Sequence, residues 1–165
     1  MRPMPSMKYA RVESERKFLL RSVPAGALEV STIVDRYLDG SRLRLRLMAR
    51  ADGSSVRKLG QKIPIEPGRV VHTTMYLDDA EWGALAHLPA AELRKVRHHY
   101  PGGLAVDVLP DGTVVAEVDG GEELPSVVPA FLDVIREVTG EEKWTGAALA
   151  RTGPSALPHA GGPTR

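Results

Sequence analysis

Residues 42–47 are Arg-Leu-Arg-Leu-Arg-Leu, a strict alternation of cationic and apolar side chains. Successive side chains of a β-strand point to opposite faces, so three arginines would line one face and three leucines the other. One interpretation is an ordinary outer sheet, with the arginines in solvent and the leucines in the core. The other is that the arginines point into an enclosed space, and the neighbouring segments must decide between the two.

The segments around residues 42–47 have the composition of strands separated by tight turns. Dipeptides that reverse a chain, such as Asp39-Gly40, Asp52-Gly53 and Pro67-Gly68, stand between them. Because short turns join antiparallel neighbours, we expect an antiparallel sheet. Eight strands are predicted, near residues 11–20, 32–38, 42–50, 55–63, 70–77, 93–100, 103–109 and 113–119.

Helices are predicted in three places. Asp78 and Glu81 have the spacing of a capping box, which predicts a helix through about Leu88. Residues 126–138 are interpreted as a second helix, with Pro129 in its first turn. A short third helix is predicted near residues 23–29.

Charged residues of matched parity recur on the other predicted strands. They are Glu13, Glu15 and Lys17, then Lys58 with Lys62, Lys95 with Arg97, and Glu117 with Asp119. Exposure to solvent would not require acids to gather on some strands and bases on others, whereas a charged lumen explains both groups. Such a lumen requires that helices cover the outer, apolar faces and that water, metal or ligand compensates the buried charge.

The composition describes one globular domain. The 165 residues are 42% hydrophobic and 26% charged, and no stretch approaches the roughly 20 apolar residues of a membrane span. No secretory signal is evident, so we expect a soluble, cytoplasmic protein that does not contact a membrane. The chain has no cysteine, so a metal would be held by oxygen or imidazole ligands. The net charge of +1 conceals nine bases against three acids over residues 36–69, and ten acids against one base over residues 101–142.

Taken in order, these motifs resemble the CYTH domain of the triphosphate tunnel metalloenzymes. Glu13-Ser14-Glu15-Arg16-Lys17 is similar to the ExExK signature that opens that domain, and the later strands carry further matching motifs, with Arg42-Leu43-Arg44-Leu45-Arg46 and Ala116-Glu117-Val118-Asp119 among them. The resemblance implies an α+β fold, an eight-stranded antiparallel barrel with helices packed outside it. It covers roughly residues 8–150, with a flexible N-terminus over residues 1–7 and a disordered tail over residues 151–165.

The resemblance also implies a function, a cofactor and a set of site residues. The expected function is hydrolysis of inorganic tripolyphosphate or a nucleoside or organic triphosphate with Mg²⁺ or Mn²⁺. The implied metal ligands are Glu13, Glu15, Asp107, Glu117 and Asp119. The implied phosphate-binding residues are Lys17, Arg44, Arg46, Lys58, Lys62, Lys95, Arg97 and Lys143. The direct catalytic roles would fall to Glu13, Glu15, Lys17 and Arg46.

Other interpretations stay open at this point. Residues 71–76 carry no acid where many family members have one, which favours a single metal ion or a binding module without turnover. A class IV-type adenylate cyclase is a further alternative. Nucleic acid is not an expected partner, because aromatic residues, at 5%, are too few to supply stacking platforms. Pairing of sheet edges into a homodimer is compatible with the sequence. Trp82 and Trp144 are interpreted as packing residues.

Overall fold

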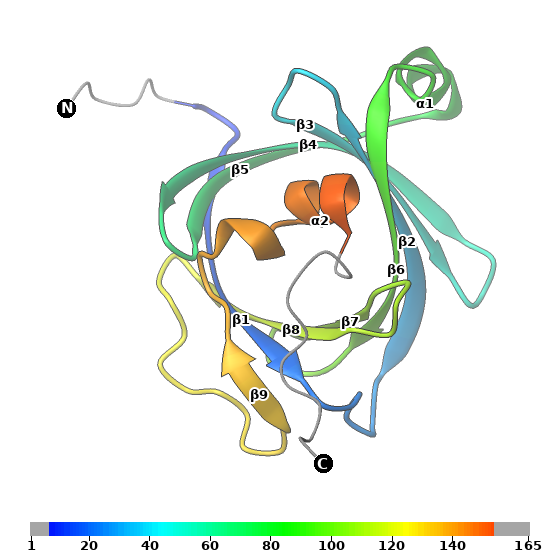
Figure 1. The fold of residues 1–165 in the computed structure, drawn as a ribbon. Coiled ribbons are helices and arrows are strands. Elements are labelled where there is room, and N and C mark those ends of the chain that lie inside the picture. Colours follow the sequence, from blue (N-terminus) through cyan, green and yellow to red (C-terminus); the bar gives the residue numbers. More distant parts are fainter. Residues whose placement is uncertain (1–6, 154–165) are drawn as a thin grey trace.

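The computed structural model describes residues 7–153 (Figure 1). The strands are β1 (Arg11–Leu20), β2 (Glu29–Leu38), β3 (Leu43–Arg50), β4 (Ser55–Glu66), β5 (Arg69–Tyr76), β6 (Ala90–His99), β7 (Leu104–Val108), β8 (Val114–Gly121) and β9 (Val134–Glu137). The helices are α1 (Asp79–Leu85), the 3-10 turn η1 (Glu142–Trp144) and α2 (Gly146–Thr152). The predicted flexible N-terminus and C-terminal tail lie almost wholly outside the described residues.

Eight of the strands close into a barrel in which all neighbours are antiparallel. Their order is β5-β4-β3-β2-β6-β7-β8-β1, and β5 pairs with β1 to close the ring (Figure 1). The closing pairs join residues 11–14 of β1 to residues 69–72 of β5. Strand β9 takes the same edge of β1 farther along, opposite Phe18 and Leu20. The predicted eight-stranded antiparallel barrel is therefore confirmed, with one extra strand.

Residues 43–47 of the alternating stretch lie in β3. Arg44 and Arg46 do not face bulk solvent, whereas Arg42, just before the strand, is exposed. Arg46 lies opposite Asp35 of β2 and Lys58 of β4, and its side chain is largely buried. Leu45, which points the other way, is also fully buried. Both faces of this strand are enclosed, so the interpretation as an ordinary solvated sheet is excluded.

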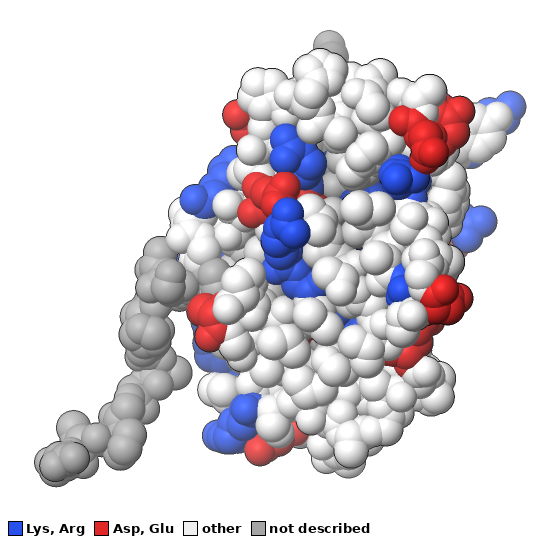
Figure 2. Space-filling view, turned by 90° about the vertical axis from the view of Figure 1, so that its right-hand side faces the viewer, with Lys and Arg blue, Asp and Glu red and all other residues white. Residues whose placement is uncertain are grey.

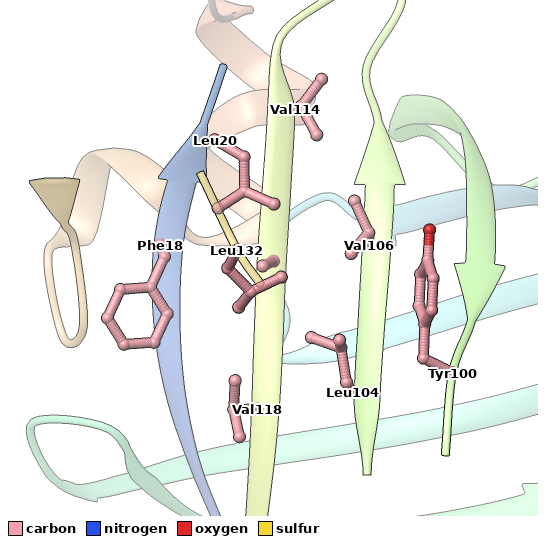
Figure 3. Close-up of a cluster of buried hydrophobic side chains, with 9 residues drawn as sticks. Phe18, Leu20, Tyr100, Leu104, Val106, Val114, Val118 and Leu132 are labelled. Carbon is pink, nitrogen blue, oxygen red and sulfur yellow. The ribbon is translucent and has the colours of Figure 1, made fainter. Parts of the chain in front are cut away.

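The outer face of β1, β7 and β8 carries a hydrophobic cluster (Figure 3). Phe18, Val106 and Ala116 are buried there, and Leu132 from the segment before β9 covers them. The cover that the sequence analysis predicted was a helix over residues 126–138, and that prediction is wrong. The segment is irregular up to β9.

The sequence of this segment explains why it is not helical. Pro125 and Pro129 lack backbone N–H groups, and Val127-Val128 is a β-branched pair that favours extended backbone. The edge of β1 beside residues 18–20 also offers hydrogen-bonding groups that only a strand can satisfy. The helix predicted near residues 23–29 is likewise absent, because Gly26 adopts φ +87°.

Helix α1 confirms the predicted capping box. The Asp78 side chain accepts from the backbone N–H of Glu81, and the Glu81 side chain accepts from the backbone N–H of Asp78. Helix α2 was not predicted, and Figure 1 shows it across the opening of the barrel. Its Leu149 packs with Trp144, Leu93 and Val115 in a second apolar cluster, so Trp144 is a packing residue as predicted. Within residues 7–153, every helix is too short or too polar to cross a bilayer.

Candidate functional site

A cavity of about 460 Å³ lies inside the barrel, beneath α2. Strand alternation directs side chains from β1, β3, β4, β6 and β8 into it. Nine of the predicted site residues line it: Glu13, Glu15, Lys17, Arg44, Arg46, Lys62, Lys95, Arg97 and Glu117. Residues that lie far apart in the sequence thus meet in one enclosed space.

Four predicted site residues do not line this cavity. Lys58 lies with its ammonium 5.3 Å from the centre of the Tyr76 ring. Asp119 is exposed, and one of its oxygens accepts from the backbone N–H of Gly121. Lys143 is exposed in η1. Asp107 is buried in the barrel interior, where it pairs with Lys95 and Arg97.

The charges that segregate along the sequence are not gathered into one patch on the visible surface. Figure 2 shows one side of the molecule, on which basic and acidic side chains are interspersed among neutral ones. In the interior, acids and bases face one another: Asp35 pairs with Arg46, and Asp107 pairs with Lys95 and Arg97.

Four carboxylates line the cavity: Glu13, Glu15 and Glu117 from the barrel strands, and Glu142 from η1. The negative charge of Glu117, together with burial, raises the pKa of Glu15 above its usual value. Burial alone would also raise the pKa of Glu117, but the charges of Arg97, Lys17 and Lys95 hold it well below the usual range. Two acids are thus close enough to repel each other, and a cation between them would relieve that repulsion.

Asp35 is a buried acid beside the basic part of the cavity, and it holds one of the arginines. Its carboxylate accepts from Arg46 Nε at 2.7 Å and from Arg46 Nη2 at 2.8 Å. Burial would raise the pKa of Asp35, but these hydrogen bonds outweigh it and the pKa is lowered. Arg46 is therefore oriented by the protein and retains only part of its donors for a ligand.

Asp107 of β7 binds two basic residues of β6 in a similar way. It accepts from Lys95 at 2.7 Å and from Arg97 at 2.7 and 2.8 Å. Arg97 also donates to Glu117 at 2.9 Å, so it links the buried acid to the cavity. Both oxygens of Asp107 are occupied by cations, which makes it a poorer donor to a metal than the three glutamates of the barrel strands.

Arg44 is a cation of the cavity lining that the protein leaves partly unsatisfied. Its Nε is buried and, within residues 7–153, has no hydrogen-bond partner, and the nearest oxygen of Asp35 is 3.8 Å away. A buried guanidinium N–H without an acceptor is costly, so this group has a strong preference for an anion in the cavity.

Lys17 and Tyr37 connect the cavity to the segment that covers it. Lys17 Nζ donates to the backbone carbonyl of Trp144 at 3.1 Å and lies 3.7 Å from Glu117. Tyr37 packs directly against Gly146 at the start of α2, and burial raises its pKa to about 12. The phenol therefore stays protonated at neutral pH.

The donors suit a magnesium or manganese ion that shares its ligands with a substrate. In the described part of the chain, no three or more His, Asp or Glu side chains are grouped so that they alone could hold a metal. Mg²⁺ commonly binds through one or two carboxylates and completes its shell with water and substrate phosphates. Glu15 and Glu117, with Glu13 nearby, supply oxygen donors of this kind, so the residues fit the expected ion.

Sequence reasoning missed two residues of the site, Asp35 and His72. Each faces a recognised site residue across a hairpin: Asp35 pairs with Arg46, and His72 pairs with Lys62. The signal that would have found them is hairpin register, because these pairs are symmetrical about the Asp39-Gly40-Ser41-Arg42 turn and about Pro67.

The fold is shared with two solved structures. One is the crystal structure of the hypothetical protein NE1496, with a TM-score of 0.52 and 22% identity over 84% of this chain and 97% of that chain. The other is the crystal structure of the inorganic triphosphatase NE1496, with a TM-score of 0.51 and 21% identity over 84% of this chain and 93% of that chain. At these identities the likeness shows the fold. No protein-family model matches the chain, and no curated protein sequence does.

Proposed function

We propose that the chain is a triphosphatase that uses Mg²⁺ or Mn²⁺ to hydrolyse inorganic tripolyphosphate or a nucleoside or organic triphosphate. The observation that carries the proposal is the enclosed cavity in which Glu13, Glu15 and Glu117 face basic residues, among them the unsatisfied Arg44. A triphosphate is a linear polyanion that requires such a basic lining. The shared fold with an inorganic triphosphatase supports the assignment.

The glutamates would hold the metal ion, whose charge would stabilise the developing charge on the phosphate oxygens. Arg44, Lys62 and Lys17 would bind the phosphate chain, and Arg46 and Arg97 would contribute the donors that Asp35 and Asp107 leave free. Water adds to the terminal phosphorus and the bond to the bridging oxygen breaks, with release of one proton. Tripolyphosphate would give orthophosphate and pyrophosphate, and a nucleoside or organic triphosphate would give orthophosphate and the corresponding diphosphate. Phosphoryl transfer needs mainly positioning and charge neutralisation, so no covalent nucleophile is required.

One observation favours a second candidate, a binding module for polyphosphate or nucleotides without efficient turnover. Strand β5 brings no acid into the cavity, and no three-ligand metal cluster is present in residues 7–153. A protein of this kind would bind tripolyphosphate through the same basic residues and release no phosphate.

The test is phosphate release from tripolyphosphate and from ATP with Mg²⁺ or Mn²⁺. Glu15→Gln and Glu117→Gln should each lower the rate by roughly a hundredfold or more, since metal stabilisation is worth several kcal/mol. Glu92→Gln is the matched control, because Glu92 forms surface ion pairs with Arg36 and Arg94. Binding of tripolyphosphate with no release under either metal would establish the binding module, and cyclic AMP among the products of ATP would establish a cyclase.

A further inference from the structure

His72 is the one ionisable side chain that β5 contributes to the cavity lining, in the part of the chain that the structure describes. It lies opposite Lys62 of β4, and the neighbouring inward residue of β5, Val70, lies opposite Glu13 of β1. His72 therefore stands at the seam where β1 and β5 close the barrel, beside the acidic part of the cavity.

The imidazole makes a short hydrogen bond to one of the proposed metal ligands. His72 Nδ1 lies 2.6 Å from Glu13 Oε2. An ionised carboxylate can only accept, so Nδ1 must carry the proton. Lys62 Nζ is 3.5 Å from the other oxygen, Oε1, which is thus the less satisfied of the two.

The other ring nitrogen is held on the far side from Glu13. Thr74 Oγ1 lies 3.2 Å from His72 Nε2. A Cβ atom at Gly60 of β4 would lie 3.2 Å from both His72 Nε2 and Arg44 Nη2. Because glycine has no side chain, both groups have room at this position. A cation at Nε2 would lie close to the Arg44 guanidinium, which argues against Nε2 as a direct metal ligand.

We propose that His72 is a positioning residue for the metal site, whose Nδ1–H fixes one oxygen of Glu13 and presents the other to a divalent cation. The inference rests on the proposed function in assigning Glu13 to the metal. Through His72, strand β5 would then contribute to metal binding although it carries no carboxylate. Hydrogen-bonded partners of metal ligands commonly change metal affinity by about ten- to a hundredfold when they are removed.

The experiment compares three substitutions of His72 by the affinity for Mn²⁺, measured from the electron paramagnetic resonance signal of free Mn²⁺ without any substrate. His72→Ala removes the donor. His72→Asn places an amide N–H close to the position of Nδ1, whereas His72→Gln places one close to Nε2. His87→Ala is the matched control, because His87 is exposed after α1. Thermal unfolding of each variant shows whether it is folded.

We expect His72→Ala and His72→Gln to raise the dissociation constant for Mn²⁺ by about tenfold or more, and His72→Asn to stay within about threefold of the parent protein. Metal-free binding of tripolyphosphate should change little in all three, since the basic residues are untouched. Equal Mn²⁺ affinity in parent and His72→Ala would overturn the inference, and so would an equal loss in the Asn and Gln variants.

The outcomes also separate this inference from the proposed function. If the parent binds Mn²⁺ but releases no phosphate, the proposed hydrolysis falls while the comparison of affinities still decides the part of His72. If phosphate is released normally and the His72 variants bind Mn²⁺ like the parent, only the inference about His72 falls. If the parent binds no Mn²⁺ either alone or together with tripolyphosphate, both are overturned.

Discussion

Asp35 and Arg46 face each other across β2 and β3 and form a two-point ion pair inside the barrel, with Asp35 fully buried. Two parallel N–H···O bonds fix the plane of the guanidinium as well as its position. Neither partner can be removed without leaving an uncompensated charge away from water. Asp35 therefore holds Arg46 in position without itself lining the cavity.

Substitution of Asp35 by Ala should lower the free energy of unfolding by about 3–5 kcal/mol, the usual cost of breaking a buried ion pair. Chemical denaturation measures the change. The control is Asp133→Ala, because Asp133 pairs with Arg21 at 2.7 Å but is 57% exposed. That exposed pair should contribute about 1 kcal/mol or less. Similar losses of unfolding free energy in the two variants would show that burial does not increase the contribution of the Asp35 ion pair to stability.

Acid should destabilise the protein partly through Asp35. Its pKa in the folded state lies below the ordinary value of 3.8, although burial opposes the shift, because Arg46 outweighs it. The folded state therefore binds this proton less readily than the unfolded state. The stability that Asp35 contributes is fully present above about pH 4 and is lost as pH falls through the folded pKa.

Unfolding measured by denaturant at a series of pH values tests this dependence. The free energy of unfolding should decline from about pH 4 downward, and the decline should be shallower in Asp35→Asn. Asp133→Asn should keep the slope of the parent protein. An unchanged slope in Asp35→Asn would mean that Asp35 does not take part in the acid transition.

Arg44 and Arg46 should respond differently to truncation, although they are neighbours on the same face of β3. Arg44→Ala leaves the pair between Asp35 and Arg46 intact, so it should weaken tripolyphosphate binding by roughly ten- to a hundredfold with little loss of stability. Arg46→Ala strands the buried charge of Asp35 and should cost about 3–5 kcal/mol of stability.

Calorimetric titration with tripolyphosphate, together with thermal unfolding, separates these two effects. The double substitution Asp35→Asn with Arg46→Ala should recover part of the stability lost in Arg46→Ala, since the stranded charge is gone. If Arg44→Ala proves as unstable as Arg46→Ala, the assignment of ligand binding to Arg44 and of fold stability to Arg46 is wrong.

The contact between Tyr37 and Gly146 leaves no room for a side chain at the start of α2. A Cβ atom at Gly146 would clash with the Tyr37 hydroxyl oxygen. Gly146→Ala should therefore destabilise the protein, even though Ala is the better helix former. Gly83→Ala in α1 is the matched control, because nothing lies within 4 Å of the added atom. That control should stabilise by about 0.5–1 kcal/mol.

Thermal unfolding of both glycine variants gives the comparison. Tyr37→Phe removes the oxygen that the new methyl group would meet, so it should reduce the loss caused by Gly146→Ala when the two are combined. Stabilisation by Gly146→Ala alone would show that α2 does not pack against Tyr37 as described.

The strands and their inward charges could be predicted because both follow from alternation and turn residues. Residues 11–20 were predicted as a strand with the bounds of β1, and the parity of Glu13, Glu15 and Lys17 placed all three in the cavity. Parity fails where a strand ends: Asp119 shares the parity of Glu117 but lies beyond the enclosed part of β8 and is exposed.

Other features depended on partners that lie far away in the sequence. The segment 126–138 has an apolar spacing compatible with a helix, and only the edge of β1 decides that residues 134–137 form a strand. Asp107 was expected to bind metal, yet the two cations brought to it by β6 occupy both of its oxygens. No local sequence pattern reveals whether a buried acid will face a metal ion or a basic side chain of the protein.

Trp144 and Leu149 complete the interior of a barrel whose eight strands end at Gly121. During synthesis the chain leaves the ribosome from its N-terminus, so every strand of the ring is available before the residues that cover its opening. A nascent chain that ends before Trp144 would already contain all eight strands of the barrel. Leu93 and Val115 would lack the side chains of Trp144 and Leu149 that pack on them, and Lys17 would lack its carbonyl partner. The order of translation thus places the residues that cover the cavity after all eight strands that form its wall.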